Sequence, residues 1–250
     1  MAFKLLTSVK DYALELLFPL KCAACRKETE SKKKNKLICT DCLKLLSPSL
    51  DFYCPLCEAK TADGALCFSC RLIISNTETK FYLDRLFHPY SYKDPAIQRV
   101  IKAFKYQFIQ GLEEPLGRLM SRYLGKINGK LDLNDYLVIP VPLHRRKYNQ
   151  RGYNQSELIA SKISQFLNLE MAADSLVKSK ATKDQAKLKE SERLKNLKNA
   201  YACSKPWLVS GKKVLLIDDV YTTGSTMAEC AKVLKEAGAS EITGLAIARG

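Results

Sequence analysis

The most specific chemical pattern in this sequence is the run VLLIDDVYTTGST, which covers Val214 to Thr226. It combines hydroxyl side chains with a glycine that lets the backbone approach a ligand closely, so that successive N–H groups can surround an anion. These residues are Thr222, Thr223, Gly224, Ser225 and Thr226. A helix is expected to follow, and its N-terminal dipole attracts negative charge. The run therefore predicts a phosphate-binding turn.

Two carboxylates, Asp218 and Asp219, stand directly before this turn. They would repel a phosphate placed against them, but ribose hydroxyls donate hydrogen bonds to carboxylates. The sequence has no G-x-x-x-x-G-K-[ST] and no G-x-G-x-x-G, so the fingerprints of P-loop and dinucleotide sites are absent. One loop can thus hold both ends of a ribose 5-phosphate, with Asp218 and Asp219 as candidate catalytic residues. The alternative is that the two aspartates only cap a helix or face solvent.

Eight of the ten cysteines form Cys-x-x-Cys pairs before residue 71. The pairs are Cys22/Cys25, Cys39/Cys42, Cys54/Cys57 and Cys67/Cys70. Two intervening residues let both sulfurs of a tight turn reach one tetrahedral ion, and reduced cytosolic thiols disfavour a disulfide scaffold. We expect two structural zinc ions, each with its coordination sphere filled by four thiolates. Consecutive pairs are favoured, the first two on one ion and the last two on the other; interleaved pairs are the alternative.

Short apolar runs alternate with helical patterns in the rest of the chain. We expect strands at 83–92, 137–141, 214–217 and 242–248, the last three buried on both faces because they are continuously apolar. Such alternation predicts an α/β fold with a mostly parallel sheet covered by helices. Ligands bind such sheets beyond the carboxyl ends of the strands, which is where the phosphate-binding turn falls.

A helix is expected to begin at Asp94-Pro95, an N-cap followed by a proline at the first helical position. Its apolar face is expected to run from Ile97 to Phe108, with Lys105 pointing elsewhere. Cys230 falls on the apolar stripe of a later helix and is expected in the core. His88 and Trp207 have no chemical partners nearby in the sequence, and we expect both to be structural.

The composition is that of a folded protein, since 250 residues with 46% apolar side chains can fill a core. The formal net charge of +15 favours phosphorylated or nucleic-acid partners. Charged residues interrupt the apolar stretch 1–19, which predicts an amphipathic helix and no membrane span. We therefore expect a cytoplasmic protein with two regions: an N-terminal helix and zinc module in 1–80, and the sheet domain in 81–250.

The run VLLIDDVYTTGST resembles the phosphoribosyl diphosphate (PRPP) binding motif of type I phosphoribosyltransferases. PVPLHRRKYNQRGYNQ (140–155) and KATKDQAKLKESERLKNLKNAY (180–201) resemble the loop after the first core strand and the basic flexible loop of the competence protein F family (ComF-like, GntX-like). Members of that family place a double zinc ribbon before a phosphoribosyltransferase domain. The resemblance runs from about Pro19 to Arg249, nearly the whole chain.

This resemblance implies a type I phosphoribosyltransferase-like parallel sheet, preceded by a small double zinc ribbon. Asp218 and Asp219 would hold the ribose, and the turn 222–226 the 5′-phosphate. Pyrophosphate would lie against the loop near Leu143, His144, Arg145 and Arg151, with Mg²⁺ bridging it to the ribose hydroxyls. The lid over it would use Gln185, Lys187, Arg193 and Asn196.

The resemblance also implies a Mg²⁺-dependent phosphoribosyltransferase that works in natural transformation, with single-stranded DNA and a DNA helicase as partners. Two alternatives stay open from the residues. The domain could be a non-catalytic PRPP sensor whose zinc ribbon binds DNA or a helicase, or it could be a nucleobase salvage enzyme. The last ranks lowest, because no base-recognition hood can be read from the sequence.

Overall fold

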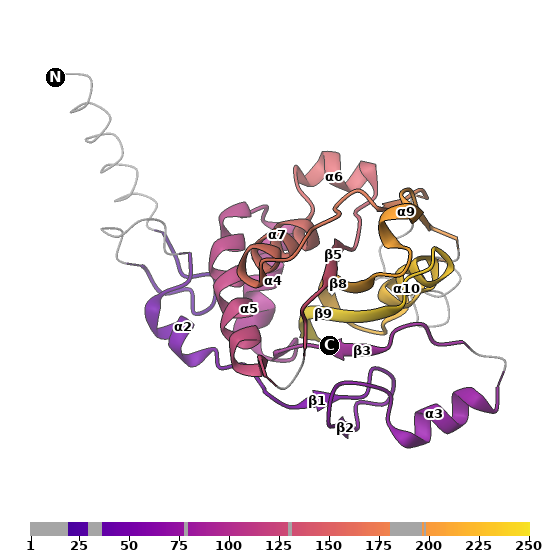
Figure 1. The fold of residues 1–250 in the computed structure, drawn as a ribbon. Coiled ribbons are helices and arrows are strands. Elements are labelled where there is room, and N and C mark those ends of the chain that lie inside the picture. Colours follow the sequence, from indigo (N-terminus) through magenta and orange to yellow (C-terminus); the bar gives the residue numbers. More distant parts are fainter. Residues whose placement is uncertain (1–19, 30–36, 78–79, 130–131, 181–196, 198) are drawn as a thin grey trace.

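A five-stranded parallel sheet forms the centre of the molecule in the computed structural model, which describes residues 20–29, 37–77, 80–129, 132–180, 197 and 199–250 (Figure 1). Its order is β3-β9-β8-β5, and β4 pairs with the end of β9. The strands are β3 (Arg85–Phe87), β4 (Tyr90–Ser91), β5 (Tyr136–Pro140), β8 (Lys213–Tyr221) and β9 (Glu241–Arg249). Every pair is parallel, so the carboxyl ends meet at one edge. The predicted fold class is confirmed.

Strand β8 is longer than the apolar run predicts. It continues through both aspartates to Tyr221, because Val220 and Tyr221 pair with Ala248 and Arg249 of β9. The predicted strand over 83–92 is interrupted at His88 and Pro89, which separate β3 from β4.

Helices cover both faces of the sheet (Figure 1). On one face lie α4 (Pro95–Tyr106), α5 (Glu113–Ile127) and α7 (Gln155–Leu167), with the short 3-10 helix η1 (Gln110–Leu112) between the first two; α9 (Pro206–Val209) and α10 (Ser225–Glu236) lie on the other. Side chains of β8 alternate between the two cores: Leu215 and Ile217 join the first, Val214 and Leu216 the second. This is the two-sided burial that the apolar runs predict.

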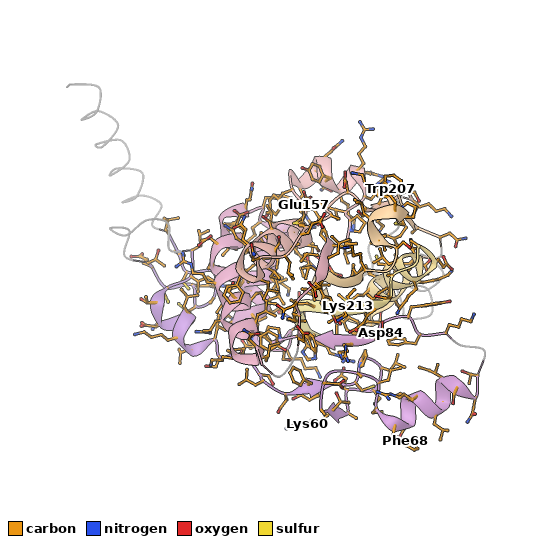
Figure 2. All side chains as sticks on the ribbon, in the orientation of Figure 1. Lys60, Phe68, Asp84, Glu157, Trp207 and Lys213 are labelled. Atoms are coloured by element: carbon orange, nitrogen blue, oxygen red, sulfur yellow. The ribbon has the colours of Figure 1, made fainter. Side chains whose placement is uncertain are left out.

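Helix α4 begins as predicted, since the Asp94 carboxylate accepts hydrogen bonds from the backbone N–H of Ala96 and Ile97. The helix ends at Tyr106, so the expectation for Phe108 is wrong: it has a φ of 57° and its side chain is 48% exposed. Cys230 is buried in the core as predicted. Trp207, which was expected to be structural, lies on α9 with 70% of its surface exposed (Figure 2).

The first ribbon, residues 20–29 and 37–46, packs against α4 and α5 and contains α2 (Thr40–Leu45) (Figure 1). Ala24, Ile38 and Leu46 are buried in the same core as α4, α5 and α7. The guanidinium of Arg122 on α5 donates to the carbonyls of Leu43 and Leu46. The first ribbon is therefore continuous with the core of the sheet domain.

The second ribbon, residues 52–75, lies beside β3 and contains β1 (Phe52–Tyr53), β2 (Lys60–Thr61) and α3 (Phe68–Ser75) (Figure 1). Strands β1 and β2 are antiparallel. The ring of Phe52 lies 5.4 Å from that of Phe87 on β3, and the N–H of Leu86 donates to the Gly64 carbonyl. The boundary near residue 80 stays a prediction, since both ribbons pack on the sheet domain.

Strands β6 (Leu176–Lys178) and β7 (Tyr201–Cys203) form an antiparallel pair. The predicted lid residues between them, Gln185, Lys187, Arg193 and Asn196, lie outside the described residues. Within the described part of the chain, the helices are too short or too polar to cross a bilayer.

Candidate functional site

A cavity of about 390 Å³ opens at the carboxyl edge of the sheet; we call it the carboxylate cavity. Its walls come from α4, the loop after β5, the start of α7, the β6–β7 pair and the end of β8. Both aspartates of β8 line it, together with Thr222 and Thr226. Elements far apart in the sequence thus meet where a parallel sheet is expected to bind its ligand.

The two aspartates differ in their partners. Asp218 Oδ1 accepts hydrogen bonds from the hydroxyl of Ser156 at 3.0 Å and from the N–H of Asp219 at 2.8 Å. Burial and the neighbouring carboxylate of Asp219 raise the pKa of Asp218 to about 7, although Lys105 acts in the opposite direction. Asp219 is only 6% exposed and pairs with the Lys105 ammonium at 2.7 Å.

Lys105 corrects the sequence prediction, because its side chain turns into the carboxylate cavity. It sits near the end of α4, where a long stem can reach over the strand ends to Asp219. Burial disfavours its charge, but the carboxylates of Asp219 and Asp218 raise the pKa of Lys105 above its ordinary value. Helical periodicity placed this residue off the apolar face, and it could not show that a charged partner lies there.

The residues 222–226, the phosphate turn, connect β8 to α10. They line a hollow of about 30 Å³ together with the end of β8 and the start of α10. Gly224 has a φ of 75°, and a Cβ there would overlap the hydroxyl and Cζ of Tyr221, so both backbone and space call for glycine. The hydroxyls of Thr223 and Ser225 lie 2.9 Å apart, and α10 begins at Ser225. The two hydroxyls therefore lie together at the N-terminus of α10, and anion binding by this turn stays a prediction.

The predicted pyrophosphate loop is only partly at the cavity. Leu143 and Arg151 line it, and Arg151 lies 5.9 Å over the ring of Tyr106. His144 instead caps α6 (Arg145–Arg151), its Nδ1 accepting from a backbone N–H, and Arg145 is exposed outside the lining. The sequence reading missed Lys147, Gln155 and Ser156, which do line the cavity. The sequence could have indicated these three residues, because they lie in or next to the basic run 140–155.

The paired cysteines form two groups whose ligand atoms lie within 4.8 Å of one another. The grouping is consecutive, not interleaved: Cys22, Cys25, Cys39 and Cys42, then Cys54, Cys57, Cys67 and Cys70. The sulfurs of Cys25 and Cys39 are 3.9 Å apart, and those of Cys57 and Cys67 are 3.5 Å apart. Tetrahedral zinc with bonds of about 2.3 Å separates its sulfurs by roughly 3.8 Å, so both groups fit this ion.

Backbone hydrogen bonds lower the pKa of the first cysteine of each group, whereas the pKa of the third and fourth cysteines of the first group and of the second and fourth of the second group is raised. Burial alone would raise the pKa of Cys22 and Cys54, but hydrogen bonds from the backbone around each sulfur lower it to about 7. For Cys22 these bonds include one from the N–H of Cys39 at 3.3 Å. The clustering of four sulfurs in each group is what supports structural zinc at both sites.

The second ribbon contacts the strand ends that carry the phosphate turn. The Tyr221 hydroxyl donates to the Pro55 carbonyl at 3.0 Å. Arg249, at the end of β9, donates from Nη1 to the Cys54 carbonyl at 3.0 Å and from Nη2 to the Pro55 carbonyl at 3.1 Å. Its guanidinium lies 5.1 Å over the ring of Tyr221. The same Cys-x-x-Cys turn that offers two zinc ligands therefore holds the residue just before the phosphate turn.

Comparison with known proteins agrees with this architecture. Residues 154–249 match the phosphoribosyl transferase domain family and residues 13–71 the double zinc ribbon domain family. Competence protein F of Haemophilus influenzae is 30% identical over 242 residues, 93% of this chain and 98% of that protein. DNA utilization protein YhgH of Escherichia coli O157:H7 is 37% identical over 150 residues, 59% of this chain and 65% of YhgH. Competence protein ComFC of Bacillus subtilis is 26% identical over 206 residues, 82% of this chain and 81% of ComFC.

Sheet, phosphate turn and the two four-cysteine ribbons together define a phosphoribosyltransferase-type domain joined to a double zinc ribbon. The likeness to competence protein F extends over almost the full length of both chains. The chain belongs to the competence protein F family.

Proposed function

We propose that the chain binds PRPP with Mg²⁺ in the carboxylate cavity and acts in the use of DNA taken up by the cell. The observation that carries the proposal is the end of β8, where a turn suited to an anion follows directly on two carboxylates. A phosphorylated ribose requires a phosphate site next to a sugar site, and the phosphate turn follows directly on the two aspartates. The family's phosphoribosyltransferase domain supports this assignment.

Each part of PRPP has a partner of suitable chemistry in this arrangement. The ribose hydroxyls donate to Asp218 and Asp219, and the phosphate turn takes the 5′-phosphate. Lys105, Lys147 and Arg151 form a positive wall for the pyrophosphate. When bound, Mg²⁺ would supply positive charge that neutralises the oxygens of the leaving group. As the anomeric carbon loses pyrophosphate, the carboxylates tolerate the positive charge that develops on the sugar.

Calorimetry with PRPP and Mg²⁺ tests the binding proposal. We expect Asp218→Asn and Asp219→Asn to weaken PRPP affinity at least tenfold, because an amide accepts a hydroxyl hydrogen bond less strongly than a carboxylate. Asp174→Asn is the matched control, since Asp174 is exposed and pairs with Lys205 at the surface. Unchanged affinity in both site variants would exclude the proposed ribose contacts.

Turnover separates an enzyme from a sensor. We propose a Mg²⁺-dependent phosphoribosyltransferase, which releases pyrophosphate in step with use of PRPP when an acceptor is present. A non-catalytic sensor would bind PRPP with the same dependence on Asp218 and Asp219 and release none. A time course of pyrophosphate in the intact zinc-loaded chain, with Asp219→Asn as the blank, distinguishes the two.

The partners that we propose are single-stranded DNA and a DNA helicase, and the place of action is the cytoplasm. The names of two relatives, competence protein F and DNA utilization protein, support a role with DNA, and the net charge of +15 supports a polyanionic partner. We expect affinity for a single-stranded oligonucleotide to fall steeply as salt rises, because bound cations are released from the phosphates. A flat salt response would argue against a basic DNA-binding surface.

A further inference from the structure

The two four-cysteine groups differ in how far solvent reaches them. In the first group, Cys22 and Cys42 are buried, and Cys25 and Cys39 are half-buried. In the second group, Cys57 is exposed. A cysteine reacts with a dissolved oxidant only where the oxidant can reach its sulfur. The second group is therefore the more accessible to oxidation, and Cys57 is the point of entry.

Cys57 has a second sulfur close beside it. The sulfur of Cys67, a half-buried residue, lies 3.5 Å away. A disulfide bond is about 2.05 Å long, so the two sulfurs need to approach by only about 1.5 Å to form one. Zinc keeps its cysteine ligands as thiolates, which is the form that attacks an oxidant. An accessible thiolate next to a second cysteine is the arrangement found at cysteines that oxidise reversibly.

The second ribbon also has less apolar packing than the first to hold it without its metal. In α3, all of whose residues are described, only Cys70 is buried. Phe68, Leu72 and Ile73 on the same helix are 81%, 51% and 62% exposed, and α3 lies at the outer edge of the molecule (Figure 1). The helix is therefore attached through a zinc ligand, and loss of the ion should loosen it.

The first turn of the second ribbon, residues 54–58, holds the end of β9. The side chain of Arg249 is only 7% exposed, and it donates to the carbonyls of Cys54 and Pro55. Its Nε also pairs with the carboxylate of Glu58 at 3.1 Å. A buried charge that loses its partners is strongly destabilising. If this turn unfolded, the guanidinium and the end of β9 would have to move.

We propose that the second ribbon is a site of reversible oxidation by hydrogen peroxide. The Cys57 thiolate attacks one peroxide oxygen: an S–O bond forms, the O–O bond breaks, and hydroxide leaves with the electron pair. The Cys67 thiolate then attacks the Cys57 sulfur: the S–S bond forms, and a second hydroxide leaves with the electrons of the S–O bond. The two sulfurs lose two electrons, and the two hydroxide ions become water by taking two protons from the buffer. The zinc ion keeps only Cys54 and Cys70 as ligands and dissociates.

Oxidation should also disturb the phosphate turn, and this second statement rests on the proposed function. Without zinc, the turn 54–58 releases both Arg249 and the Tyr221 hydroxyl, which donates to the Pro55 carbonyl. Tyr221 lies directly against the phosphate turn, because a Cβ on Gly224 would overlap its hydroxyl. A shift of Tyr221 therefore reaches the residues proposed to bind the 5′-phosphate.

The test treats the zinc-loaded full chain with hydrogen peroxide. A coloured chelator measures the released zinc, and mass spectrometry of non-reduced peptides locates the disulfide. In the parent, we expect the first zinc ion to leave in step with a Cys57–Cys67 disulfide, and dithiothreitol with added zinc to restore the site. Oxidation of Cys203, which is half-buried outside both groups, releases no zinc and is followed separately in the same peptides.

Two variants that each keep one zinc ion provide the matched comparison. Cys25→Ser retains the second site and should release its zinc at the rate of the parent's first ion. Cys57→Ser retains the first site and should release its zinc about tenfold more slowly, because its sulfurs are less accessible. Equal rates in the two variants, or a disulfide in the parent that joins Cys57 to a cysteine other than Cys67, would overturn the oxidation site.

Calorimetry with PRPP and Mg²⁺ on the reduced, oxidised and restored parent tests the consequence for the phosphate turn. We expect oxidation to weaken PRPP affinity about tenfold and restoration to recover it. Unchanged affinity in the oxidised chain would overturn the link between the second ribbon and the turn. Absence of PRPP binding in the reduced parent would overturn the proposed function, and zinc release with the peptide map would still decide the oxidation site.

Discussion

The two zinc ribbons share their cysteine spacing but serve different parts of the molecule. Each has one arginine that donates to two of its backbone carbonyls: Arg122 to Leu43 and Leu46 in the first, Arg249 to Cys54 and Pro55 in the second. Arg122 comes from the middle of a scaffold helix. Arg249 comes from the end of β9, at the edge where ligands are expected to bind.

The packing differs in the same way. The first ribbon buries several apolar residues in the core under α4 and α5, whereas the second adds Phe52 to that core and meets the strand ends through polar contacts with Tyr221 and Arg249. A motif repeated in sequence therefore need not be repeated in role. We expect the first ribbon to govern stability and the second to govern the phosphate turn.

Loss of one zinc site at a time should give the largest contrast. We expect Cys57→Ser to lower PRPP affinity more than tenfold, because the turn that holds Tyr221 loses its metal, and Cys25→Ser to leave affinity within twofold. Neither side chain is fully buried, so the chain should remain folded. Metal analysis should find one zinc ion in each variant, and calorimetry measures the affinities. Equal losses of affinity would remove the distinction between the ribbons.

The two arginines allow a matched substitution. Arg249→Met should weaken PRPP binding about fivefold, since it frees the Cys54 and Pro55 carbonyls from the end of β9. Arg122→Met should leave PRPP affinity unchanged but reduce the free energy of unfolding by about 2 kcal/mol, as expected for hydrogen bonds from a charged group. Urea unfolding measures the free energy of unfolding of both variants, and calorimetry measures their PRPP affinity. An unchanged PRPP affinity in Arg249→Met would contradict the link.

Removal of one hydroxyl should have a smaller effect. Tyr221→Phe deletes the hydrogen bond to Pro55 and should weaken PRPP binding about threefold, in line with roughly 1 kcal/mol or less for a neutral hydrogen bond. Tyr90→Phe is the control, because the Tyr90 hydroxyl donates at 3.4 Å to Leu46 of the first ribbon. A loss of PRPP affinity in the control as large as in Tyr221→Phe would count against a special role of the second ribbon.

The pH dependence should be the smallest effect and independent of both ribbons. The pKa of Asp218 is raised to about 7, so the carboxyl is protonated below that pH and accepts ribose hydroxyls poorly. PRPP affinity should therefore rise as pH increases through about 7, more in the parent than in Asp218→Asn, which corrects for titration of PRPP itself. Calorimetry across this pH range should show the same midpoint pH for the rise in PRPP affinity in the parent and in Arg249→Met. A shifted midpoint in Arg249→Met would show that the second ribbon influences the carboxylates.

Local patterns predicted the scaffold well. Cysteine spacing indicated two four-sulfur groups, apolar runs indicated the strands of the parallel sheet, and Asp94-Pro95 marked the start of α4. Each depends on residues close in sequence, where the period of a helix or strand and the reach of a short turn decide the outcome.

Contacts between distant segments could not be predicted in this way. Lys105 pairs with Asp219 across more than 100 residues, and burial together with the charge of Arg249 lowers the pKa of His88. Strand β8 continued past its apolar run because β9 paired with its polar end. His144 was expected at the pyrophosphate, but its Nδ1 accepts a hydrogen bond from a backbone N–H at the start of α6. The family resemblance predicted the position of the pyrophosphate loop, but only the fold determines which of its side chains face the carboxylate cavity.

The separation in sequence between each ribbon and its arginine gives the chain an order of assembly. Arg122 lies 79 residues beyond Leu43, whereas Arg249 lies 195 residues beyond Cys54. During synthesis from the N-terminus, the first ribbon meets its partner while β8 and β9 are still to be made. The second ribbon can form its hydrogen bonds with Arg249 only after β9 has been synthesised. Contacts between residues so far apart in sequence form slowly. The phosphate turn is therefore among the last parts of the molecule to reach its final shape.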